Sequence, residues 1–73
     1  MSPRLPVVSG QDTVRALRAV GFEQISQRGS HVKLRNTEGR TVIVPMHREL
    51  APGTLRSILR QAARSAEEYT ALL

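Results

Sequence analysis

The stretch that decides the fold is Gly29-Ser30-His31-Val32-Lys33-Leu34-Arg35, in which apolar and polar residues alternate. Successive side chains point to opposite faces of a β-strand, so Val32 and Leu34 are predicted to face a core. His31, Lys33 and Arg35 would then share the opposite face. The pattern predicts a strand with one buried face and, on the other face, an imidazole beside two cations.

Two further strands are predicted around this one, which we expect to cover residues 31–36. Residues 23–28 form the first strand, and residues 40–44, rich in β-branched side chains, form the third, which Pro45 ends. The segment Asn36-Thr37-Glu38-Gly39 is typical of a turn, because its glycine adopts a positive φ at little cost.

A helix is predicted before the strands, over residues 10–20. Ser9 and Asp12 form a capping box at its start, and Gly21 suits the position just past its end. Its buried side is predicted to hold Val14, Leu17 and Val20.

A second helix is predicted after the strands, beginning at Pro52 and running to about Ala63. Arginines recur every four residues on a side away from its apolar stripe, which is either a solvated helix side or a contact surface. The arginines are Arg56, Arg60 and Arg64, and the stripe is Leu55, Ile58, Leu59 and Ala62.

A last short helical turn is predicted from Ser65, with Glu68 at the capping-box position and with Leu72 and Leu73 packing inward. Residues 1–8 are expected to be an extended lead-in. The order of elements predicts an α+β fold, in which a three-stranded antiparallel sheet carries the helices on one face and leaves the other open. This is the layout of a double-stranded-RNA-binding domain.

The charge of the chain points to its partners. Eleven Lys and Arg residues against six Asp and Glu give a net charge of +5 over 73 residues, and all but one of the cations are arginine. Because arginine binds phosphate bidentately, this bias favours a nucleic acid or an acidic protein as partner. The alternative is a basic protein whose charge has no specific role in binding. The aromatic residues, Phe22 and Tyr69, are too few for a surface that stacks bases.

Other features of the composition predict a cytoplasmic protein without a metal or cofactor. The chain has no cysteine and no apolar run of the roughly 18 residues that a membrane span needs. Its first residues are too short a segment, and too interrupted by proline, for a signal peptide. The two histidines, His31 and His47, make a poor ligand set for a metal.

Short motifs follow one another along the chain at defined spacings. They are Gly21-Phe22, Gly29-Ser30-His31, Val44-Pro45 followed by His47, Glu49-Leu50, Pro52-Gly53-Thr54-Leu55 and Ile58-Leu59-Arg60-Gln61-Ala62. In these motifs the chain resembles HicA-type toxins, the small mRNA interferases of bacterial toxin–antitoxin pairs. The resemblance implies a single domain over residues 1–73, with a core from about 9 to 69 and a fold like a double-stranded-RNA-binding domain. Many relatives carry a glycine where this chain has Ala62-Ala63-Arg64.

The resemblance also implies an activity, which is cleavage of mRNA without a metal through one essential histidine. The family motif places that histidine at His31, and a HicB-type antitoxin would cover its face. His31 would act as a general base on a ribose 2′-hydroxyl or as a general acid on the departing 5′-oxygen. The alternative is a surface histidine at the start of a strand.

Residues around His31 are expected to bind RNA. Gly29 would let the substrate backbone approach closely, and the hydroxyl of Ser30 would donate to a phosphate. Lys33, Arg35 and, more weakly, Arg28 would stabilise negative charge on the phosphate. An ordinary turn beside a solvated strand face explains the same residues.

A possible secondary site comprises His47, Gly53 and Thr54. His47 is either a second acid or base or a brace for the helix that follows. The free N–H groups of Gly53 and Thr54 at the start of that helix could hold a phosphate. Two further functions stay open, namely an RNA-binding module without catalysis and a basic domain that binds an acidic protein.

Overall fold

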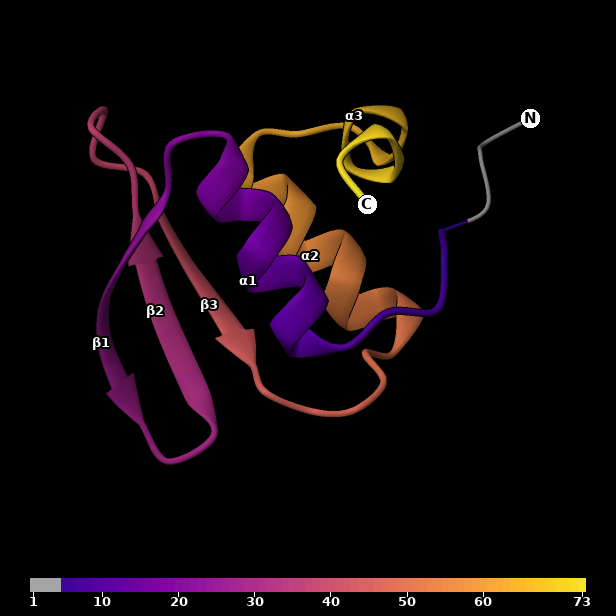
Figure 1. Ribbon diagram of the computed structural model, residues 1–73, viewed down its shortest axis with the longest axis horizontal. Coiled ribbons are helices and arrows are strands. Elements are labelled where there is room, and N and C mark those ends of the chain that lie inside the picture. The colour runs from indigo at the N-terminus through magenta and orange to yellow at the C-terminus, as the bar shows by residue number, and fades with distance from the viewer. Residues whose placement is uncertain (1–4) are drawn as a thin grey trace.

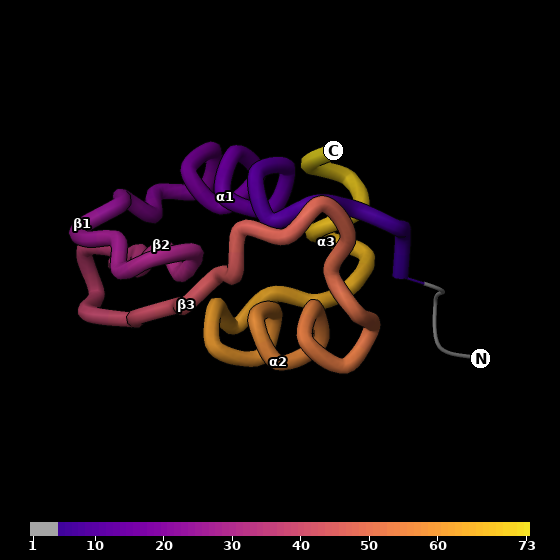
Figure 2. Tube along the Cα trace, turned by 90° about the horizontal axis from the view of Figure 1, so that it is seen from below, coloured from indigo at the N-terminus to yellow at the C-terminus, as the bar shows by residue number. Residues whose placement is uncertain are grey.

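The computed structural model describes residues 5–73 and contains a three-stranded antiparallel sheet in the order β1-β2-β3. The sheet forms one layer and the helices lie on one side of it (Figures 1 and 2), which confirms the predicted α+β fold. Residues 5–9 form neither helix nor strand, and the rest of the expected lead-in lies outside the described residues. The elements are α1 Gly10–Ala19, β1 Glu23–Arg28, β2 His31–Arg35, β3 Thr41–Pro45, α2 Pro52–Ala62 and α3 Ala66–Ala71.

The central strand β2 separates the core from the open face as its alternation predicts. Val32 and Leu34 are buried, whereas His31 and Arg35 are exposed and Lys33 is half-buried. On β3 the residues opposite the two buried side chains, Val44 and Val42, are also buried. The helices therefore pack on the side of the sheet that carries the valines and Leu34.

The helices begin and end close to the predicted residues. The Ser9 hydroxyl accepts a hydrogen bond from the Asp12 N–H at 3.0 Å, and the Asp12 carboxylate accepts one from the Ser9 N–H at 3.3 Å. Val20 caps the end of α1 and is only half-buried, although its sequence position predicted burial. The apolar stripe predicted for α2 is buried in full: Leu55, Ile58, Leu59 and Ala62.

The start of α1 lies against the end of β3 and fixes the loop that follows it. A Cβ added to Gly10 would lie 2.1 Å from the carbonyl oxygen of Pro45, so glycine is required at this contact. The Gly10 N–H donates to the carbonyl of His47 at 2.9 Å, and the Leu50 N–H donates to the carbonyl of Val8 at 2.8 Å. The loop of residues 46–51 is thus hydrogen-bonded both to the start of α1 and to the segment before it.

The last helix, α3, lies beside α1 and α2 on the side away from the sheet (Figure 2). Buried Tyr69 makes a 2.7 Å hydrogen bond with the Thr13 hydroxyl. Since Thr13 itself donates to the carbonyl of Ser9 at 3.0 Å, the phenol of Tyr69 is the donor to Thr13. Burial, the largest cause, raises the pKa of Tyr69 above its ordinary value of 10.0.

The predicted capping box of α3 is present, but the predicted packing of the final residue is wrong. The Ser65 N–H donates to the Glu68 carboxylate at 3.0 Å, and this bond is the largest cause that lowers the pKa of Glu68. Leu72 is half-buried against the core, whereas Leu73 is 55% exposed. Leu73 lies beyond the helix cap at Leu72 and so has no helix turn to hold it inward.

The two edges of the sheet differ. On β3 the Ile43 N–H points away from β2 and donates to the Gln61 side chain at 3.1 Å, while Arg40 donates to the Gln61 carbonyl at 3.1 Å. On β1 every residue is exposed, and a register shift between Gln24 and Ser26 leaves Ile25 at a bulge. The β3 edge is closed by α2, and the β1 edge is uncovered.

The strand boundaries shift by one residue from the prediction. β3 includes Pro45 instead of ending before it. Backbone nitrogens two residues apart in a strand point to the same side, so the ring nitrogen of Pro45 points away from β2, like the N–H of Ile43. Proline therefore costs no hydrogen bond between β3 and β2. β2 ends at Arg35, because the Asn36 side chain accepts from the N–H groups of Glu38 and Arg40 and starts the turn. Within residues 5–73 no helix is both long and apolar enough to cross a membrane.

Replacing Ala63 by glycine is expected to stabilise the fold. Ala63 follows α2 with φ 56° and ψ 41°, and it is the one non-glycine residue with positive φ among residues 5–73. The Arg64 N–H donates to the Leu59 carbonyl at 2.9 Å, as in a helix end that normally carries glycine at this position. The Ala63→Gly variant should gain about 1 kcal/mol in urea unfolding, from relief of left-handed strain.

The matched control for that variant is Ala19→Gly, at an exposed helical position with ordinary φ. Glycine there should lower the free energy of unfolding by a few tenths to about 1 kcal/mol. Equal destabilisation by both substitutions would show that the conformation of Ala63 is not strained.

Stability is expected to fall as the pH rises above 10. The raised pKa of Tyr69 means that the folded state retains a proton that the unfolded chain loses first, near pH 10.0. The stabilisation is therefore complete below that pH and is lost on raising the pH toward the higher folded-state pKa. Urea unfolding between pH 8 and pH 11 should show this loss in the wild type.

The Tyr69→Phe variant separates this effect from the titration of other groups. It should be about 1 kcal/mol less stable at pH 7, because the Thr13 hydroxyl loses its donor. Its stability should fall less steeply than that of the wild type above pH 10.0. Parallel pH profiles of the two proteins would contradict the role of Tyr69.

Candidate functional site

His31 is the first residue of β2 and follows directly on the two-residue turn Gly29-Ser30. Its cross-strand neighbours are Arg28 on β1 and Pro45 on β3. The side chain is exposed, and within residues 5–73 its imidazole makes no hydrogen bond. A free imidazole beside a guanidinium is an arrangement that can exchange protons with a bound anion.

The turn before His31 depends on its glycine. Gly29 has a φ of 58°, and Ser30 does not share the positive φ, the pattern of a tight hairpin turn with glycine at its first central position. The Gln27 side chain donates to the Gly29 carbonyl at 3.1 Å. Both Gly29 and Ser30 are exposed, so the backbone of the turn is open to a ligand.

The register of the sheet continues the polar face from His31 along β2. Lys33 pairs across with Ser26 and Ile43, and directly paired residues lie on the same face of a sheet. Ile43 is 38% exposed there, as expected on a side of the sheet that no helix of residues 5–73 covers (Figure 1). Ser26, which sequence reasoning did not single out, becomes a neighbour of Lys33 only through the register.

Arg35 lies at the far end of the same face. It pairs with Glu23 on β1 and with Thr41 on β3, and its Nε donates to the Thr41 hydroxyl at 3.3 Å. The face therefore carries Arg28, His31, Lys33 and Arg35, with one carboxylate, Glu23, at the end away from His31. This confirms the shared face that the alternation of residues 31–35 predicts.

His47 lies in the loop after β3, and the structure brings this loop to the turn before His31. The N–H of Met46, the preceding residue, donates to the Ser30 carbonyl at 2.6 Å. The His47 carbonyl accepts from Gly10, and its side chain is exposed. The distance between the two segments could not be predicted from the sequence, because they are brought together only by backbone contacts of residues far apart in the chain.

Gly53 and Thr54 lie on the first turn of α2, at the other end of the loop from β3. Ala51 precedes the helix and provides no side-chain cap. Within the described range, no hydrogen bond joins these residues to the turn before His31. No group of three or more His, Cys, Asp and Glu residues among residues 5–73 could hold a metal ion.

Comparison with known proteins finds one protein family that this chain matches. A family model described as the HicA toxin of bacterial toxin–antitoxin systems matches residues 10–63. The matched segment runs from the start of α1 to Ala63, the residue after α2, and includes the whole sheet. A search of curated proteins finds no match.

Replacing Gly29 by alanine is expected to cost about 1 kcal/mol of stability, because alanine is strained at a φ of 58°. No atom lies within 4 Å of the added Cβ, so the cost is one of backbone conformation alone. Gly53→Ala is the control, since Gly53 is helical and also has free space around it; that variant should gain about 0.5–1 kcal/mol in urea unfolding. A neutral Gly29→Ala variant would contradict the turn geometry.

Proposed function

The chain belongs to the HicA toxin family of bacterial toxin–antitoxin systems, and we propose that it is a metal-independent endoribonuclease that cleaves mRNA. His31 is the proposed essential acid or base. The observation that carries the proposal is the exposed imidazole of His31, which has no hydrogen-bond partner among residues 5–73 and lies at one end of a row of cations on the open face of the sheet.

The proposed reaction is an internal transfer at a phosphodiester. The ribose 2′-oxygen forms a bond to phosphorus while the bond from phosphorus to the 5′-oxygen breaks, which leaves a 2′,3′-cyclic phosphate and a free 5′-hydroxyl. One proton leaves the 2′-hydroxyl and one reaches the departing oxygen. His31 performs one of these transfers, and general acid–base catalysis of this kind contributes roughly 10²–10⁴-fold.

The neighbours of His31 supply charge and access in this proposal. Arg28, directly across from His31, and Lys33, further along the same face, offer positive charge to the phosphate as negative charge develops. Gly29 and Ser30 form an exposed turn that a substrate backbone can approach. Arg35 would bind a neighbouring phosphate, since its guanidinium is already oriented by Thr41.

The second proton transfer has a candidate in His47. The hydrogen bond between Met46 and Ser30 holds the two histidine-bearing segments together at one end of the sheet. Water is the alternative partner for that proton. Gly53 and Thr54, on the first turn of α2, have no hydrogen bond to the turn before His31 within the described residues, and they enter the proposal only as a contact to a further phosphate.

The partner that restrains the toxin is proposed to be a HicB-type antitoxin that covers the face carrying His31. The family membership supports an antitoxin partner, and the net charge of +5 favours an acidic one. We place the toxin in the cytoplasm, where its proposed mRNA substrate is found.

The test is paired induction in a bacterial host of the wild type and the His31→Ala variant, with growth and the integrity of a reporter mRNA as readouts. The wild type should arrest growth and cleave the mRNA, and the variant should do neither. Circular dichroism and the unfolding midpoint should be nearly the same for both, because His31 is exposed and makes no hydrogen bond within residues 5–73.

Binding of RNA by the purified variant distinguishes catalysis from binding alone. His31→Ala should still bind single-stranded RNA, with an affinity that falls steeply as the salt concentration rises, because the phosphate-binding cations remain. Equal RNA cleavage by the wild type and the variant would rule out the catalytic role. If the wild type binds RNA without ever cutting it, the chain is an RNA-binding module.

A further inference from the structure

The structure divides the arginine row predicted for the second helix into two parts, because α2 ends at Ala62 and Arg64 lies beyond it. Arg64 pairs with Glu68 at 3.3 Å and is half-buried. Arg56 and Arg60 are exposed and make no ion pair or hydrogen bond within the described residues. Two guanidiniums one helical turn apart, about 6 Å along the axis, are therefore available to a ligand.

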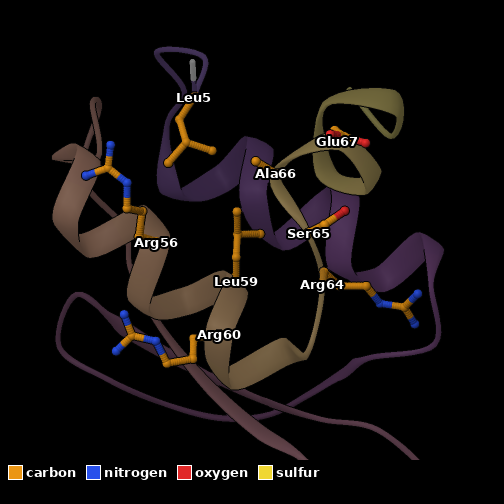
Figure 3. A pocket seen from close by; sticks show the side chains of 8 residues that line it. All are labelled: Leu5, Arg56, Leu59, Arg60, Arg64, Ser65, Ala66 and Glu67. Carbon is orange, nitrogen blue, oxygen red and sulfur yellow. The ribbon is translucent and has the colours of Figure 1, made fainter. Parts of the chain in front are cut away.

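These two arginines border a hollow of about 600 Å³ between α2, α3 and the segment before α1. Leu5, Leu59 and Ala66 line its apolar part (Figure 3). Arg56 and Arg60 lie on the α2 side, and Glu67 lies with Ala66 on the α3 side. We call this hollow the α2–α3 groove.

We propose that the α2–α3 groove is a docking site for an acidic amphipathic helix of another protein. One large apolar side chain of that helix would contact Leu5, Leu59 and Ala66. Carboxylates three or four residues apart on the same helix would face Arg56 and Arg60, because that spacing matches one helical turn. Charge complementarity and the apolar floor together define this partner.

The chemistry of the groove fits a protein segment better than RNA. Its floor is aliphatic, and the aromatic side chains on which bases could stack, Phe22 and Tyr69, are both about 99% buried in the core. A nucleic-acid strand would thus find arginines in the groove but no surface on which its bases could stack.

The groove goes beyond the proposed ribonuclease function, because none of its lining residues belongs to the sheet. A helix bound there would leave the face of His31 uncovered. The docking site therefore provides a contact that does not itself block the proposed active site. It does not depend on the chain being a nuclease.

The probe for the test is a fluorescein-labelled helical peptide of about 16 residues, with a leucine stripe flanked by glutamates. Amide shifts of the ¹⁵N-labelled full chain should cluster at Leu59, Arg60, Ala66 and Glu67 on titration. The same peptide with glutamine in place of every glutamate should bind at least tenfold more weakly.

Variants of the groove give the decisive comparison by fluorescence anisotropy. Arg56→Gln/Arg60→Gln should weaken binding by about tenfold, because the two exposed ion pairs with the peptide are lost. Ala66→Leu should weaken it without a change of charge, because it fills the apolar floor. Arg18→Gln, at an exposed arginine on α1, is the matched charge control and should change the affinity by less than about twofold.

Three outcomes would overturn the proposal. Shifts that never saturate, or that fall on the open face of the sheet, would place the peptide elsewhere. Equal binding of the glutamate and glutamine peptides would remove the role of Arg56 and Arg60. A single-stranded RNA that shifts the groove amides and competes with the peptide would assign the site to nucleic acid. These readouts are independent of RNA cleavage.

Discussion

Burial of Val32 and Leu34 between the sheet and the helices is the constraint on which the rest of the structure depends. Because side chains alternate along a strand, burial of these two residues forces His31, Lys33 and Arg35 onto the open face. A slip of one residue in the register would place the cations in the core, at a cost far above the stability of a small domain. The burial of Val32 and Leu34 therefore determines both the apolar core and the polar face.

Backbone contacts at the ends of the elements then bring distant segments to the same end of the sheet. Gly10 allows α1 to approach Pro45, and its N–H binds the His47 carbonyl. The next hydrogen bond, from Met46 to Ser30, joins the loop after β3 to the turn before His31. On the helical side, the bond between Thr13 and Tyr69 fixes α3 and so shapes the groove.

Much of this fold could be predicted from local sequence. The capping boxes at Ser9 and Ser65 and the alternation in residues 31–35 each act within a few residues, so they can be recognised without tertiary information. The position of Pro45 inside β3 could not, because it depends on which edge of the strand faces outward. Burial of Leu73 was predicted wrongly. An apolar side chain is buried only where other residues offer a surface to pack against, and Leu73 lies beyond the end of α3.

The same limit applies to the candidate site. The shared face of His31, Lys33 and Arg35 follows from one strand, but the neighbours Ser26 and Arg28 follow only from the register between strands. The loop with His47 is positioned by contacts more than fifteen residues apart in sequence, from Met46 to Ser30. The spacing of Arg56, Arg60 and Arg64 could be read from the sequence. That Arg64 lies beyond the end of α2 and pairs with Glu68, while the other two border the groove, follows only from the structure.

The unequal edges of the sheet limit how this protein can associate with itself. A strand from another molecule pairs through free N–H and C=O groups that point outward from the edge of the sheet. On β3 the N–H of Ile43 already donates to the Gln61 side chain, and Pro45 has no N–H to donate. Within residues 5–73, the edge that is more open to such a strand is that of β1. Two molecules joined there would leave no uncovered edge, so growth would stop at a pair, and the fold is protected against fibres that extend by edge-to-edge stacking.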